Sequence, residues 1–140
     1  MNTRIEEYFI KIELLLIERP IFKEYKIIKK VVLYSEGLIR IRIVLLNDDI
    51  LELFQFVEIV EDKLLSKKYS YHWQKKTGEL IKRWDSAPHY KDLDNFPHHI
   101  HNKDNAVVSN PIIPNILMIL DTIESEINFY DNTFISEKGQ

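Results

Sequence analysis

Residues 38–60, with the sequence LIRIRIVLLNDDILELFQFVEIV, decide the fold. In the first half Ile39, Ile41 and Ile43 alternate with arginines, and in the second half leucine and valine alternate with glutamate. A period of two indicates β-strands that bury one face. Residues 47–49 (Asn-Asp-Asp) lie between the halves and have the length and chemistry of a hairpin turn. The stretch therefore predicts two antiparallel strands.

The same pattern extends the sheet in both directions along the chain. A strand of about residues 26–34 comes before the hairpin and is joined to it by residues 35–37 (Ser-Glu-Gly). Strands of about residues 65–74 and 79–84 follow, joined by a turn at residues 75–78. Because every connection is a short turn, we expect a five-stranded antiparallel meander.

A helical spacing of apolar residues appears on either side of this sheet. The first such stripe lies between a capping Thr3 and Pro20 and consists of Ile5, Phe9, Ile12 and Leu16. The second is expected to begin at Asn110-Pro111 and consists of Ile113, Ile116, Leu117, Leu120, Ile123 and Ile127. The sequence predicts an α+β fold, an antiparallel five-stranded meander sheet flanked by N-terminal and C-terminal helices. Residues 1–129 form a single α+β domain, and residues 130–140 are expected to be a flexible tail.

Composition excludes several classes of protein. A formal charge of −3 argues against a strongly basic nucleic-acid-coating protein. The chain has no cysteine, so disulfides and thiolate metal sites are absent. Acidic residues near the N-terminus and the lack of any run of about 20 apolar residues speak against a signal peptide or a membrane span. We expect a cytoplasmic protein with no membrane partner.

The region richest in side chains suited to catalysis or binding is residues 69–101. It holds all five histidines and both tryptophans. If the fourth and fifth strands pair around the turn at 75–78, Trp73 faces Leu80 and the aromatic residues of both strands share one face. His72 and Arg83 then lie on the opposite face. Between Trp84 and about Asn110 we expect a long loop rich in proline and histidine, and loops of that length are often functional.

Within this loop the spacing of the histidines allows a metal site. In an extended segment His99 and His101 point the same way, while His98 points aside. With His89 or His72 as a third ligand, they would hold a divalent metal such as Zn²⁺. Asp85, followed by an alanine and a proline, is expected to cap backbone amides in an Asx-turn.

Three strings resemble the TumE-like family of small prokaryotic proteins, regarded as toxins of toxin–antitoxin pairs. They are Tyr71-His72-Trp73-Gln74, Arg83-Trp84-Asp85 with Ala87-Pro88-His89, and Phe96-Pro97-His98-His99 with His101. The resemblance implies a cognate antitoxin protein as partner. Tyr90 stands where the family pattern leads us to expect a second histidine, so no role can rest on a histidine pair at residues 89 and 90.

Two hypotheses of function follow. In the first, the protein is a toxin and a ribonuclease in which histidines exchange protons at an RNA phosphodiester while an arginine stabilises the phosphorane. Its candidate catalytic residues are His72, Arg83, His98, His99 and His101. In the second, it is a non-enzymatic binding protein whose histidine-rich loop binds a protein partner or a divalent metal, with His89, His99 and His101 as the metal ligands. The wide apolar faces of both helices also predict a homodimer.

Overall fold

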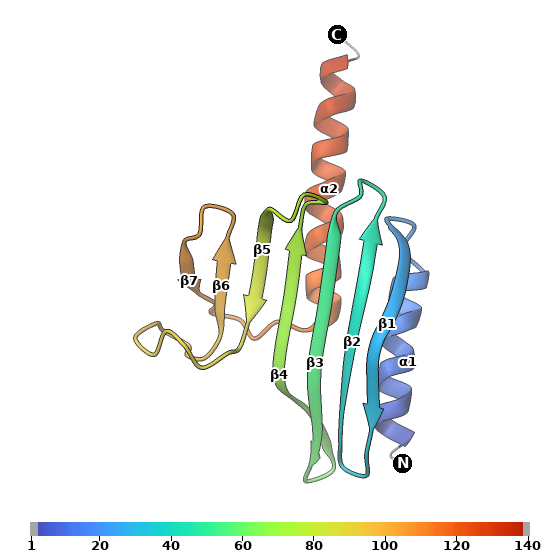
Figure 1. The fold of residues 1–140 in the computed structure, drawn as a ribbon, viewed down its shortest axis with the longest axis vertical. Helices are drawn as coiled ribbons and strands as arrows, with labels where there is room; N and C mark the ends of the chain where they lie inside the picture. Colours follow the sequence, from blue (N-terminus) through green and yellow to red (C-terminus); the bar gives the residue numbers. More distant parts are fainter. Residues whose placement is uncertain (1–2, 139–140) are drawn as a thin grey trace.

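The structure is a computed structural model that describes residues 3–138, with side chains as far as Ile127. It is an α+β fold in which two helices flank an antiparallel sheet (Figure 1). In chain order the elements are α1 (Thr3–Ile17), β1 (Phe22–Val32), β2 (Glu36–Leu45), β3 (Ile50–Val60), β4 (Lys63–Gln74), β5 (Leu80–Asp85), β6 (His99–Asn102), β7 (Val107–Ser109) and α2 (Ile116–Lys138).

The meander topology is confirmed, but the sheet has seven strands and not five. Its strand order is β1-β2-β3-β4-β5-β6-β7, and each strand pairs antiparallel with its neighbour in the chain. The two additional strands lie in the segment predicted to be a loop, where β6 pairs with β5 and β7 with β6. They have four and three residues, too few to display a hydrophobic period.

One face of the sheet carries the core. The row Ile41–Leu53–Tyr71–Trp84–Ile100 crosses five strands on this face, and its first four members are at most 5% exposed. Both helices lie behind the sheet in Figure 1, and their apolar residues belong to the same hydrophobic cluster as this row. Burying this common apolar surface is the main stabilisation of the fold.

The opposite face, which we call the outer face, carries the polar residues of the strands. Two rows cross it side by side. The first is Arg42–Glu52–His72–Arg83–His101, and the second is Arg40–Phe54–Ser70–Asp85–His99. The predicted separation of aromatic residues on one face from His72 and Arg83 on the other is therefore confirmed.

The pairing of β4 with β5 differs from the predicted register. Trp73 lies opposite Lys82 and not Leu80, because the ladder shifts between Trp73 and Gln74 and leaves Ile81 without a partner. The net displacement is two residues. Since side chains alternate with a period of two, this displacement leaves Arg83 and Trp84 on their predicted faces.

Helix α1 agrees with its prediction, and Ile5, Phe9, Ile12 and Leu16 are all buried. Helix α2 begins later than Asn110, at Ile116. Residue 113 precedes Pro114, and the residue before a proline is disfavoured in helical conformation. Asn115 then caps the helix, since its Oδ1 accepts a hydrogen bond from the Met118 amide at 2.9 Å.

The apolar stripe of α2 is also corrected in part. Ile113 and Leu117 are 63% and 44% exposed, while Ile119 is buried in the core. The flexible tail predicted for residues 130–140 stays a prediction, because α2 extends to Lys138 without described side chains there, and residues 139–140 lie outside the described residues. Among the described residues no helix has the length and apolar character needed to cross a membrane.

Candidate functional site

Three strands bring an arginine between two histidines. His72 on β4 pairs with Arg83 on β5, which pairs with His101 on β6. We call these residues the imidazole row. Neighbouring strands lie about 4.8 Å apart, so the two histidine backbones are separated by about 10 Å with the guanidinium between them. Three of the five predicted catalytic residues thus stand in one line on the outer face.

His72 is held in one neutral tautomer. The Arg83 guanidinium donates to Nδ1 of His72 at 3.2 Å, so the ring proton is on Nε2, which donates to Oε1 of Gln74 at 3.1 Å. Burial first, and then the positive charge of Arg83, lower the pKa of His72 below its ordinary value, although Gln74 and Glu52 act in the opposite direction. The imidazole is therefore a hydrogen-bond acceptor at neutral pH, aimed at the arginine.

Asp85 lies next to this row and makes the Asx-turn that the sequence predicts. Its Oδ1 accepts a hydrogen bond from the Ala87 amide at 2.7 Å, and its Oδ2 accepts one from Nε of Arg83 at 2.9 Å. Burial alone raises the pKa of Asp85, but the Ala87 amide and the Arg83 charge outweigh burial and hold this pKa below its usual range. The carboxylate is thus charged and orients Arg83.

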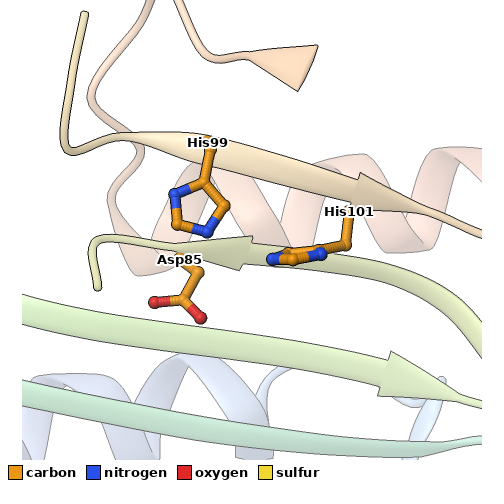
Figure 2. Close-up of side chains that lie close together, drawn as sticks. All are labelled: Asp85, His99 and His101. Carbon is orange, nitrogen blue, oxygen red and sulfur yellow. The ribbon is translucent and has the colours of Figure 1, made fainter. Parts of the chain in front are cut away.

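His99 and His101 converge on Asp85. His99 is 2% exposed and lies opposite Asp85 in the sheet. Ligand atoms of Asp85, His99 and His101 all lie within 4.8 Å of one another, and Figure 2 shows both rings turned toward the carboxylate. Tyr90 packs edge-on against both rings, with centroids 5.0 Å from His99 and 5.8 Å from His101. Burial and the neighbouring His99 lower the pKa of His101.

The other two histidines lie apart from this group. Nδ1 of His98 is 2.9 Å from the hydroxyl of Tyr69, and the two rings stack. Because Tyr69 belongs to the core face, His98 points away from His99 and His101, as the alternation predicts. His89 is exposed, and its ring meets Tyr90 edge-on at 6.4 Å. Asp85, and not His89, completes the group around His99 and His101.

Arginines and phenylalanines continue the outer face beyond the imidazole row. The guanidinium of Arg40 lies 4.7 Å above the ring of Phe54, and Arg42 forms an ion pair with Glu52 at 3.1 Å. Phe54 and Phe56 are only partly buried. The sequence offered a signal for them, since both occupy the polar positions of an alternating strand. A surface with exposed aromatic rings and arginines can contact bases and phosphates.

Comparison with known proteins places the chain in a family. No curated protein and no solved structure matches it. Residues 12–130, most of the chain, match the family described as Toxin TumE. The matched segment contains the whole sheet, the imidazole row and Asp85. A toxin of this kind implies an antitoxin as its partner. The chain belongs to the TumE toxin family.

Proposed function

We propose that this toxin cleaves RNA on its outer face by proton transfer between two histidines. The observation that carries the proposal is the imidazole row, in which His72 and His101 stand on either side of Arg83. Cleavage at a 2′-hydroxyl needs a base, an acid and a cation close to one phosphate. The row supplies all three on adjacent strands.

The roles follow from the hydrogen bonds. Arg83 exchanges its contact with His72 for a phosphate oxygen of the substrate, which frees Nδ1 of His72 to accept the proton of the 2′-hydroxyl. The 2′-oxygen attacks phosphorus and forms a 2′,3′-cyclic phosphate. His101 in its protonated form donates its proton to the 5′-oxygen as the P–O5′ bond breaks. Asp85 keeps Arg83 in place through its bond to Nε.

The rest of the outer face suits a single strand of RNA. Arg40 and Arg42 lie on β2, two strands from His72, and offer cations for further phosphates. Phe54, next to Arg40, offers a ring on which a base can stack. The formal charge of the whole chain is −3, so the attraction for RNA depends on these local cations and should weaken with salt.

The test is cleavage of a defined single-stranded RNA by the purified toxin in a chelator. The expected products end in a 2′,3′-cyclic phosphate and a 5′-hydroxyl, and the same strand made of DNA should stay intact. His72→Ala and His101→Ala should each lower the rate by about 10²- to 10⁴-fold, because proton transfer contributes about that much. Their unfolding free energy should change by less than about 1 kcal/mol.

Two substitutions serve as matched controls. His89→Ala removes an exposed histidine outside the row, and Lys82→Gln removes a cation from β5 on the opposite face, where it lies over Trp84. Both variants should keep full activity and the growth arrest that the toxin causes without its antitoxin. RNA that stays intact in the purified assay, or equal losses in His89→Ala and His72→Ala, would refute the proposal.

A further inference from the structure

One buried ring nitrogen near the imidazole row has no hydrogen-bond partner in the part of the chain that the structure describes. Nδ1 of His99 lies 2.9 Å from the carbonyl oxygen of Pro97. A carbonyl can only accept, so this nitrogen carries a proton, and in the neutral ring Nε2 then carries a lone pair. Nε2 is buried and, among the described residues, finds no partner. Buried polar atoms are nearly always satisfied, so an unpaired one needs an explanation.

The atoms that Nε2 approaches are metal ligands. One ring nitrogen of His99, one oxygen of Asp85 and one ring nitrogen of His101 lie within 4.8 Å of one another (Figure 2). Bonds of about 2.0–2.2 Å to Zn²⁺ put tetrahedral ligands roughly 3.3–3.6 Å apart. Each pair of ligand atoms therefore needs to close by at most about 1.5 Å, which small rotations of the three side chains can supply.

The residues around the three groups are arranged like the outer shell of a metal site. A metal-binding histidine usually donates its second ring nitrogen to a carbonyl or carboxylate, as His99 does to Pro97. Asp85 is oriented by Arg83 and by the Ala87 amide, one to each oxygen. A carboxylate oxygen has two lone pairs, so each keeps one for a cation.

We propose that Asp85, His99 and His101 bind one divalent transition-metal ion of the Zn²⁺ class. Two imidazoles and one carboxylate suit Zn²⁺ and similar ions, whereas Mg²⁺ and Ca²⁺ prefer oxygen ligands alone. Three protein ligands leave a fourth position open. Tyr90 packs against both histidine rings and so helps to hold them beside Asp85.

A second part of this inference rests on the proposed function. A nitrogen of His101 that coordinates the ion cannot carry a proton at the same time. The bound ion therefore removes His101 from proton transfer and inhibits RNA cleavage. The site would let the concentration of free metal set the activity of the toxin.

The binding test uses the full chain without a histidine tag. Chelator-treated protein is titrated with Zn²⁺ in a calorimeter and with Co²⁺ in an absorption spectrometer. We expect one ion per chain, and at least about 10-fold weaker binding in His101→Ala and Asp85→Asn. His89→Ala and His98→Ala remove histidines outside the group and should bind as the native chain does.

Since His99 is buried, His99→Gln serves as a further variant only if its circular dichroism is native. His101 is less buried than His99, so its variant keeps the test valid even when the His99 variant does not fold. Absence of stoichiometric binding, or equal weakening by His89→Ala and His101→Ala, would overturn the site.

The inhibition is tested separately on RNA cleavage. Zn²⁺ at a saturating concentration should lower the rate of the native toxin at least 10-fold, and a chelator should restore it. A rate that is unaffected by bound Zn²⁺, or that requires it, would overturn the inhibition and leave the site itself intact. A toxin that never cleaves RNA refutes the proposed function, while the calorimetric result still decides the metal site.

Discussion

At the scale of single residues, burial and then the charge of Arg83 lower the pKa of His72. The guanidinium donates to Nδ1 and disfavours a second positive charge on the ring. In Arg83→Gln the pKa of His72 should therefore rise toward its ordinary value, while burial keeps it from rising above that value. Titration of the ring by NMR measures this change. Lys82→Gln, on the opposite face, is the control and should leave the His72 titration unchanged.

The same residue gives a pH dependence of stability with a definite sign. A histidine whose pKa is lowered by folding contributes stability above its unfolded pKa of about 6.5, and this contribution is lost as pH falls through the lowered folded pKa. In Arg83→Gln, less stability should be lost as the pH falls, because the pKa of His72 is lowered less. An unchanged or lowered His72 pKa in that variant would show that the arginine does not act on the ring as the hydrogen bond indicates.

The residue scale also shows what the sequence could provide at the site. Alternation along the strands was sufficient to predict that His72 and Arg83 share one face of the sheet, and that His99 and His101 point the same way. It could not identify Asp85 as a neighbour of His99, because that contact depends on the pairing of β5 with β6. The Asx-turn that was predicted for Asp85 uses one lone pair of one oxygen, so it is compatible with a second role.

At the scale of elements, Gly37 lets α1 lie close to the sheet. A Cβ built on Gly37 would meet Cγ2 of Ile5 and the Val31 carbonyl oxygen at 2.8 Å each. Gly37→Ala should destabilise the protein by about 1–3 kcal/mol, because the contact with Val31 is to backbone and cannot rotate away. Urea unfolding of the variant measures this cost.

A second substitution separates the two contacts. Ile5→Ala removes the side-chain contact but keeps the contact with the carbonyl, so Gly37→Ala should still be destabilising in that background. The decrease in unfolding free energy caused by Gly37→Ala should be smaller in this background than in the native chain. If Gly37→Ala leaves the unfolding free energy unchanged in both backgrounds, Gly37 does not lie as close to Ile5 and Val31 as the structure shows.

Elements differ in how strongly the sequence specifies them. Strands β1 to β5 have six or more residues, and their alternation was sufficient to predict them. Strand β6 has one apolar residue, Ile100, and its histidines face the outer side, so its pattern resembles that of a polar loop. The start of α2 was misplaced because Pro111 is a favourable first residue of a helix, but Pro114 then prevents the helix from beginning there.

At the scale of the whole molecule, Arg19 links the segment after α1 to α2. This residue follows α1 and reaches α2, where it pairs with Asp121 at 2.7 Å and Glu124 at 2.9 Å. Arg19 is well covered, with a side chain 16% exposed, whereas Asp121 is 60% exposed. Because water screens the exposed partners, the two pairs together should contribute no more than about 1 kcal/mol.

A double-mutant cycle with Arg19→Met and Glu124→Gln measures this interaction. The coupling energy should stabilise the native state and decrease as salt is added. Hydrogen exchange of the α2 amides should become faster in Arg19→Met. The control is Arg4→Met, because Arg4 pairs with Asp62 in the β3–β4 turn. A coupling of zero at low salt would mean that the Arg19–Glu124 pair does not stabilise the fold.

The order of the strands determines when a growing chain acquires its toxic surface. A ribosome that adds about 5–20 residues per second completes β1 to β5 well before His101 is made. The aromatic rings of β4 and β5 are covered later, when α2 has been synthesised. Under the proposed function, any product of interrupted translation that ends before β6 lacks the second histidine of the row. Under that function, RNA cleavage begins only after β6 has been synthesised.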